Sequence, residues 1–474
     1  MRNKFIRLFM YLFRLKNIKW DGETPETKSL YKKALKIALP ATIEGALLSI
    51  IGSIDSMMVG HISPEALTAV GLTNQPRMIL LIITQALCVG TTALIARRKG
   101  EDDREGANRV LMQSMFFVTI IGILSMLLGF FGAHPLMYIA GAKEDTISMS
   151  VEYFKIISLA FVFNSWSLCL CAGMRAIGKT TITMVTNIAA NIVNVFFNYC
   201  LIGGNLGFPE LGVRGAAIAT ALGTFVSCAI AFAFAIKPGG YLRLSRKNFV
   251  FDKKTISGFL RVGSSSMAES AALRIGFFIN ARLIADIGTY PFAGYQIVQQ
   301  VTSLSFVLGD GVATAGATLV GQSLGSGRKD VASAYVQVSR KISHVASILL
   351  MIVIFFTRRL LAGLFTQEAA IIAGAGVAFI VVITGIIPQN GRVVYSGCLR
   401  GAGDVRFVAF CALLSVTIIR PLLTYICCYP MDQLLPGWFF AYTGPWIAFV
   451  IDAYIRQYLL SRRIQKGAFL NVTL

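Results

Sequence analysis

The segment KIALPATIEGALLSIIGSID, residues 36–55, is a long, mainly apolar run that has a counterpart later in the chain. A shift of 225 residues aligns it with RVGSSSMAESAALRIGFFIN, residues 261–280. The same shift aligns LIARRKGEDDREGA (94–107) with LVGQSLGSGRKDVA (319–332), and MRAIGKT (174–180) with LRGAGDV (399–405). Three separated matches in one register indicate that the chain consists of two related halves.

The composition places these halves in a membrane. Of the 474 residues, 55% are hydrophobic and 14% are charged, whereas soluble proteins carry about 25% charged residues. A helix of about 20 apolar residues crosses a bilayer, and the apolar segments lack the strict alternation of barrel strands. Twelve such segments are centred near residues 47, 84, 121, 162, 192, 224, 272, 307, 348, 382, 416 and 449. We therefore predict an all-α polytopic membrane protein with twelve transmembrane helices in two pseudo-symmetric six-helix lobes.

The basic residues set the expected orientation. With both termini in the cytoplasm, 35 of the 44 Lys and Arg fall in predicted cytoplasmic segments, as the positive-inside rule requires. This count includes Arg392 and Arg400, and it includes Arg456 with the C-terminal tail. The net charge of +21 thus indicates membrane topology rather than nucleic-acid binding. We predict a monomer in the plasma (inner) membrane, with the lipid bilayer as its partner.

Six helices per half give both halves the same direction through the membrane. Such parallel repeats are typical of secondary transporters. The N-terminal region lacks the apolar core and cleavage site of a signal peptide, and its mixture of basic and apolar residues favours an interfacial helix. The predicted parts are an amphipathic segment (1–33), an N-lobe (34–236), a cytoplasmic linker (237–256), a C-lobe (257–461) and a cytoplasmic tail (462–474).

Motifs for other chemistry are missing from the sequence. The glycine-rich turns GEDDREGANR and GQSLGSGRKD lack the GxxxxGK[ST] pattern of a nucleotide-binding loop. The three histidines are scattered, and the nine cysteines mostly lie in apolar segments without metal-ligand spacing. We therefore expect neither an enzyme nor a cofactor, and transport driven by an ion gradient.

Two acids on the first helix are the leading functional candidates. Glu44 and Asp55 are eleven residues apart, which places them within about 20° on one face. Ionisable residues inside a membrane usually mark an ion or substrate pathway, although a buried acid held for packing is the alternative. The fifth helix carries a stripe of amides on one face, which we expect to face the lobe interior and to meet Asp55 at its outer end. Hydrogen bonding between helices is the alternative role for this stripe, which consists of Asn187, Asn191, Asn194 and Asn198.

The ordered motifs resemble those of the multidrug and toxic compound extrusion (MATE) family. They are a proline early in the first helix, IDSMMVG followed by ALTAVG, MRAIGKT, and NIVNVFFNYCLIGGNLGFPELGVRGAAIATALG. The resemblance covers residues 30–465. It implies a V-shaped, two-lobed antiporter that exports organic compounds in exchange for Na⁺ or H⁺.

The resemblance also implies a cation site in the N-lobe. The family's helix 1 aspartate, its helix 5 asparagine and acid, and its helix 6 threonine correspond to Asp55, Asn194, Asn198 and Thr220. Asn198 departs from the family, because an acid is expected there. A site with one carboxylate would bind Na⁺ more weakly, so protonation of Asp55 is the alternative and the coupling ion stays open.

The C-lobe departs further from the family. Glu269 fits an acidic position of some members, but the helix 10 aspartate is missing, and that helix has only Gln389 and Asn390. Asp310 is a second candidate acid, and Asn280 occupies the position that the repeat assigns to Asp55. Glu269 either carries a proton or forms a charge-balancing pair with Arg274, and Arg420 is a possible internal counter-charge.

These observations predict a secondary active multidrug exporter that works by alternating access. Scattered acids and a lining of Met and Phe favour small amphiphilic or cationic organic substrates. The alternative is a lipid-linked oligosaccharide flippase of the same superfamily. Twelve helices and few internal arginines count against that alternative.

Overall fold

The computed structural model describes residue 15 and residues 18–244, 252–429 and 438–472. Within these ranges it contains helices and no strand. The first half forms α2 (Thr27–Gly60), α3 (Pro64–Gly100), α4 (Arg104–Phe131), α5 (Ala133–Ile139), α6 (Ile147–Leu159), α7 (Phe161–Ala176), α8 (Thr180–Ile202), η1 (Asn205–Gly207) and α9 (Gly212–Ile236). The second half forms α10 (Lys253–Ala285), α11 (Thr289–Gly325), α12 (Lys329–Gly363), α13 (Ala369–Ala402), α14 (Val405–Ala412), η3 (Leu413–Ile419), α15 (Arg420–Cys428), α17 (Trp438–Gln465) and η4 (Ala468–Asn471).

The predicted all-α, membrane-spanning class is confirmed. In the described part of the chain, nine helices are long and apolar enough to cross a bilayer. The bent pair α6 and α7, broken by 50°, makes a tenth. The long helices α10 and α17 do not meet this criterion, and they carry the buried ionisable residues Glu269, Asp452 and Arg456. Each of the twelve predicted segment centres lies in a described helix.

The chain divides into two compact units. Unit 1 consists of Met1–Thr42 and Ala268–Leu474, and unit 2 of Ile43–Met267. The first parts of α2 and α10 therefore belong to a different unit from the rest of each helix. This division differs from the lobe boundaries expected from the sequence repeat, which stay a prediction.

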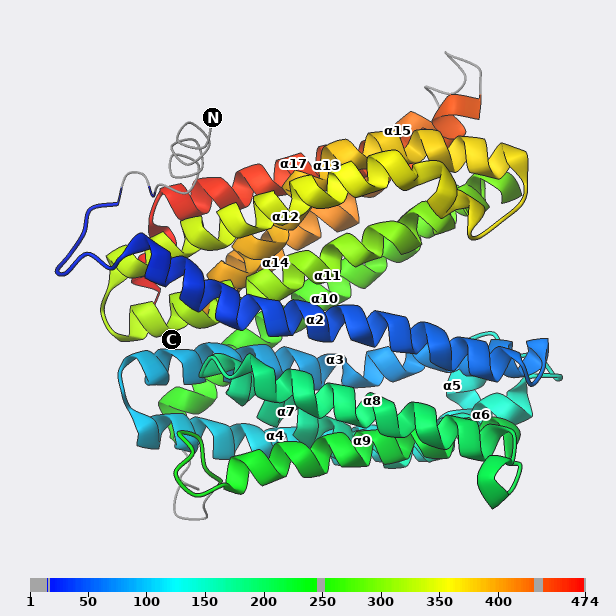
Figure 1. The fold of residues 1–474 in the computed structure, drawn as a ribbon, viewed down its shortest axis with the longest axis horizontal. Helices are drawn as coiled ribbons and strands as arrows, with labels where there is room; N and C mark the ends of the chain where they lie inside the picture. The colour runs from blue at the N-terminus through cyan, green and yellow to red at the C-terminus, as the bar shows by residue number, and fades with distance from the viewer. Residues whose placement is uncertain (1–14, 16–17, 245–251, 430–437, 473–474) are drawn as a thin grey trace. The chain divides into compact units, whose positions relative to one another are not determined.

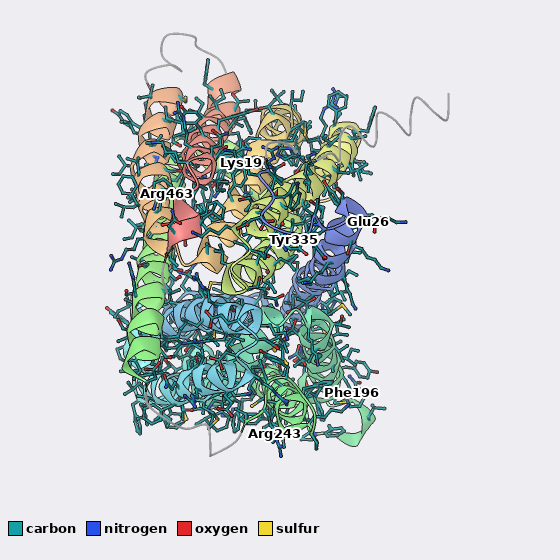
Figure 2. All side chains as sticks on the ribbon, turned by 90° about the vertical axis from the view of Figure 1, so that its left-hand side faces the viewer. Lys19, Glu26, Phe196, Arg243, Tyr335 and Arg463 are labelled. Carbon is teal, nitrogen blue, oxygen red and sulfur yellow. The ribbon has the colours of Figure 1, made fainter. Side chains whose placement is uncertain are left out.

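In unit 2, α3, α4, α7, α8 and α9 lie side by side (Figure 1). The helix α8 has two contrasting faces. Ile192, Phe196 and Tyr199 are 62, 49 and 52% exposed, and Phe196 lies at the surface of the unit (Figure 2). Asn194 and Asn198, by contrast, are 6 and 2% exposed. An apolar outer face suits lipid, so the helix directs its amides into the unit.

In unit 1, α13 packs against α11, α12 and α17 (Figure 1). The aromatic side chains Phe379 and Trp446 are fully buried there. At one end of the unit, Arg463, labelled in Figure 2, forms an ion pair of 2.8 Å with Asp404. The helical stretch Val405–Cys428 contains η3, a π-helix segment. A π-helix turn accommodates one extra residue and changes the register of the side chains that follow.

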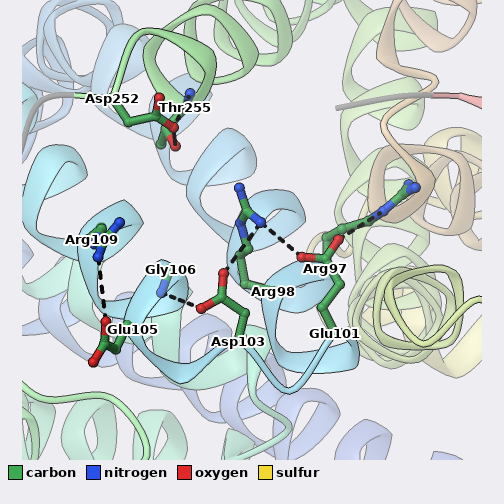
Figure 3. Close-up of polar contacts among 9 residues, drawn as sticks. All are labelled: Arg97, Arg98, Glu101, Asp103, Glu105, Gly106, Arg109, Asp252 and Thr255. Atoms are coloured by element: carbon green, nitrogen blue, oxygen red, sulfur yellow. Dashed lines mark hydrogen bonds and ion pairs between the residues drawn. The ribbon is translucent and has the colours of Figure 1, made fainter.

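The glycine-rich turn between α3 and α4 is held together by its own charges (Figure 3). The carboxylate of Asp103 accepts a hydrogen bond from the Gly106 backbone nitrogen at 2.8 Å and so caps α4. Arg98 forms ion pairs with Glu101 at 3.0 Å and with Asp103 at 3.4 Å. Helix capping and local ion pairs thus account for these acidic residues.

Most of the predicted amphipathic segment (1–33) and part of the predicted linker (237–256) lie outside the described residues, at 1–14, 16–17 and 245–251. Three arginines of the predicted cytoplasmic count have partners inside unit 1. Arg392 and Arg400 lie inside α13 and Arg456 inside α17, where their guanidinium groups contact acids or amides of unit 1.

Candidate functional site

The two acids on α2 each meet an amide on α8. The Asn187 side-chain nitrogen donates to Glu44 Oε1 at 2.6 Å, and that of Asn198 donates to Asp55 Oδ1 at 2.7 Å. Both pairs are separated by 143 residues along the chain. The two helices therefore run parallel in one register over the eleven residues between the acids.

Asn194 and Thr220 complete the surroundings of Asp55. The Asn194 amide nitrogen lies 3.4 Å from Thr220 Oγ1. With the amide group turned over, its nitrogen donates to the two Asp55 oxygens at 2.8 and 3.0 Å, and its oxygen accepts from the Thr220 backbone nitrogen at 3.2 Å. The structure thus brings together Asp55, Asn194, Asn198 and Thr220. Their role in cation coupling stays a prediction.

The donor set at Asp55 fits a hard monovalent cation. Such ions prefer oxygen ligands, and the carboxylate, two amide oxygens and the Thr220 hydroxyl supply them. The Asn198 side-chain oxygen is buried and has no hydrogen-bond partner among the described residues. Buried oxygens are normally satisfied. An amide can donate to the free carboxylate in one orientation and offer its oxygen to a cation in the other.

Two further residues act on this site and were missed in the sequence analysis. The Thr220 side chain and the Asp55 charge both act on the Tyr153 hydroxyl of α6. The charge of Arg77 on α3 acts on Asp55. The sequence placed Arg77 at the outer side of the membrane, the same half as Asp55, but gave no sign that α3 and α6 approach α2. A positive charge that acts on the Asp55 carboxylate would weaken the binding of a cation there.

Glu44 is enclosed by a separate set of partners. It is 7% exposed and accepts a hydrogen bond of 2.8 Å from Thr183 Oγ1 in addition to that from Asn187. Arg175 Nη1 lies 3.8 Å from Glu44 Oε1, the oxygen that Asn187 also contacts. Asn191 donates instead to the Asn187 backbone oxygen at 2.7 Å. Asn187 therefore contacts Glu44, whereas Asn194 and Asn198 contact Asp55.

Thr183→Val is expected to destabilise the protein by about 1–3 kcal/mol, because it deprives a buried carboxylate of one donor without changing the side-chain shape. The unfolding temperature in detergent provides the measurement. Thr357→Val is the matched control, since the Thr357 hydroxyl is exposed and bonds only to the Val353 backbone oxygen. Equal stability of the two variants would show that Glu44 does not depend on Thr183.

In unit 1, Glu269 forms ion pairs with Arg400 at 2.7 Å and Arg456 at 3.2 Å. Neither arginine was considered as its partner in the sequence analysis. The shift of 225 residues relates Glu269 to Glu44 and Arg400 to Arg175. The two halves therefore share one acid–arginine pair, and only the second adds another arginine to it.

The other candidates of the second half have partners of their own. Thr424 Oγ1 donates to Asn280 at 2.6 Å across a separation of 144 residues, one more than in the first half. The π-helix η3 precedes Thr424 and accounts for one extra residue. Asp310 is exposed, and its charge acts on Arg400. Glu269, Asn280 and Asp310 thus do not reproduce the arrangement around Asp55.

Asp452 on α17 is a buried acid that the sequence analysis missed. It is 0% exposed and accepts a hydrogen bond of 3.0 Å from Arg420 Nε, and a further one from Ser415. Asp452 is therefore the counter-charge for Arg420. The spacing of Asp452 and Arg456, one helical turn apart in an apolar segment, is the sequence signal that could have identified them.

Comparison with known proteins gives consistent matches along the chain. The MatE family model matches residues 40–200 and again 266–426. The chain is 27% identical over 471 residues to the "Probable multidrug resistance protein NorM" of Thermotoga maritima, covering 96% of this chain and 97% of the relative. It is 26% identical to "Multidrug resistance protein PmpM" of Pseudomonas aeruginosa over 457 residues, covering 92 and 91%.

The fold has a close counterpart among solved structures. The crystal structure of MATE in the straight conformation superposes with a TM-score of 0.85 at 21% identity, covering 94% of this chain and 97% of the other. Structures of this kind have twelve helices in two lobes. At this level of identity the likeness establishes the fold.

Proposed function

Because the chain belongs to the MatE family of membrane transporters, we propose that it is a secondary active multidrug exporter. It exchanges small amphiphilic or cationic organic compounds for Na⁺ or H⁺ by alternating access. Relatives named as multidrug resistance proteins support the substrate class. It works as a monomer in the inner membrane, with both termini cytoplasmic and without a cofactor.

The observation that carries the coupling proposal is the hydrogen bond between Asp55 and Asn198 inside unit 2. A cation or proton at Asp55 removes the negative charge that attracts the amide nitrogens of α8. The contact between α2 and α8 then weakens, and the two helices can adopt a second packing. Coupling follows if the substrate prefers one packing and the ion prefers the other.

The second candidate function is translocation of lipid-linked oligosaccharides. The buried arginines of unit 1 remove one reason against it, because the sequence analysis counted few internal arginines. Movement of a fluorescent lipid-linked oligosaccharide in proteoliposomes is the direct test. We favour drug export, because the relatives described above carry multidrug resistance names.

Everted membrane vesicles test the main proposal. The vesicles receive either a Na⁺ gradient or a pH gradient, and accumulation of a fluorescent cationic drug is followed. We expect accumulation under one gradient and its collapse when that gradient is dissipated. Drug accumulation that depends on neither the Na⁺ gradient nor the pH gradient would contradict ion-coupled export.

Asn198→Asp is expected to strengthen Na⁺ binding at least about fivefold. The variant restores the second acid that the family resemblance implies, and a carboxylate about 4 Å from a cation contributes roughly 1–4 kcal/mol. The Na⁺ concentration that half-saturates transport or tryptophan fluorescence is the measurement. Asn191→Asp on the same helix is the control, because the Asn191 side chain donates to the Asn187 backbone oxygen and not to Asp55. An equal change in both variants would exclude a specific role of position 198.

A further inference from the structure

The interior of unit 1 holds more positive than negative charge. Arg392, Arg420 and Arg456 are 5, 3 and 2% exposed. Glu269 and Asp452, 3 and 0% exposed, are the buried acids near them. The guanidinium group stays charged at all physiological pH values, so the excess cannot be removed by deprotonation. The other buried acids of this unit in the described residues, Asp330 and Asp404, pair with Arg328 and Arg463 at helix ends.

The buried acids near these arginines already form ion pairs. Asp452 pairs with Arg420, and Glu269 pairs with both Arg400 and Arg456. Arg392 has no acid among its hydrogen-bond partners in the described part of unit 1. Its Nε and Nη2 both donate to one neutral oxygen, Gln389 Oε1, at 3.1 and 2.7 Å. The positive charges of Arg456 and Arg420 repel it, and the weaker effects of the Asp452 and Glu269 charges attract it.

Several donors in this region remain unsatisfied. Arg456 Nε and Nη1 and Gln389 Nε2 are buried and find no hydrogen-bond partner among the described residues. Buried polar atoms are rarely left without a partner, and those on charged groups cost the most. All three atoms are donors. The missing partner is therefore an acceptor, and the surplus charge requires it to be negative.

The first half of the chain shows that this charge is not a requirement of the fold. The shift of 225 residues relates Arg392 to Ser167. In unit 2, Ser167 is buried and joined to the buried Ser227 by a hydrogen bond of 2.7 Å. A neutral hydroxyl thus fills the place that carries an arginine in unit 1.

We propose that unit 1 binds a small inorganic anion, of the size of chloride, through Arg392 and the free donors of Arg456. Charge-assisted hydrogen bonds from guanidinium groups are suited to this task. The ion must be compact, because α13 and α17 pack closely here. A Cβ atom at Gly391 would lie 2.6 Å from Gln457 Nε2. This site goes beyond the export function and does not depend on which cation drives it.

Binding can be tested on the full-length protein purified in detergent. The protein is transferred into sodium gluconate and titrated with sodium chloride at constant Na⁺ concentration and ionic strength. We expect the unfolding temperature to rise by a few degrees with saturation, and radioactive chloride to bind at about one ion per chain. Sodium sulfate at the same ionic strength is the control for general salt effects. Identical unfolding temperatures in chloride and gluconate, without bound chloride, would overturn the proposal.

The variant Arg392→Gln separates the site from general stability. It removes one of the three buried positive charges that repel one another, so we expect it to be at least as stable as the wild type in gluconate. We expect it to lose the response to chloride and the bound ion. Arg109→Gln, at an exposed pair with Glu105 in unit 2, should keep both. A chloride response that persists in Arg392→Gln would exclude this site, and loss of folding in gluconate would contradict the predicted relief of repulsion.

Discussion

Asp55→Asn is expected to reduce gradient-driven drug accumulation in everted vesicles at least about tenfold, within the range of typical coupling free energies of 1–3 kcal/mol. The amide preserves the shape of the side chain but carries no charge. It can neither bind a proton nor balance the charge of Na⁺. Asn198, which donates to Asp55 Oδ1, would hold α2 against α8 in the same way whether or not the ion is present.

Asp286→Asn is the matched control for this variant. Asp286 is exposed and pairs only locally with Arg282, four residues before it, at 3.2 Å. Both variants should be present in the membrane in equal amounts, which an immunoblot of the vesicles verifies. Undiminished accumulation by Asp55→Asn under both a Na⁺ and a pH gradient would remove Asp55 from the coupling mechanism.

Asp452→Ala is expected to destabilise the protein by about 3–5 kcal/mol, because it leaves the Arg420 guanidinium buried without its partner. Asp452 is fully buried and accepts hydrogen bonds from both Arg420 and Ser415. The unfolding temperature in detergent and the yield of folded protein are the measurements. The double variant Asp452→Ala/Arg420→Met should recover much of the loss, since it removes both charges.

An exposed ion pair supplies the comparison. Glu105→Ala removes the partner of Arg109 on α4, where the two side chains are 80 and 47% exposed. Exposed pairs contribute about 0–1 kcal/mol, so this variant should unfold close to the wild type. If Asp452→Ala were equally mild, the ion pair with Arg420 would be unimportant for folding.

Hydropathy was sufficient to predict the twelve segments, and helical periodicity to predict the shared face of Glu44 and Asp55. It also predicted that the outer asparagines of α8 lie near Asp55. This prediction was possible because the two helices are long and each carries its polar residues on one face. Tyr153 and Arg77 could not be found in this way, because their approach to Asp55 depends on the packing of four helices. Hydropathy describes one helix at a time.

The arginines of unit 1 show a different limit. Arg392, Arg400 and Arg456 lie near the ends of their apolar segments in the sequence, where the positive-inside rule assigns basic residues to the cytoplasm. In the structure the helices continue past them, to Ala402 and Gln465. Long helices can thus enclose charges close to their ends. Hydropathy cannot distinguish an arginine that flanks a transmembrane segment from one that pairs with a polar group inside the protein.

The two equally spaced contacts between α2 and α8 determine which motion is available to α2. Glu44 is fixed by Thr183 and Asn187 and by the charge of Arg175, and none of these contacts involves Asp55. Eleven residues of helix span about 16 Å. We therefore expect the outer part of α2 to pivot at Glu44 and to move away from α8, because sliding along α8 would break both contacts at once.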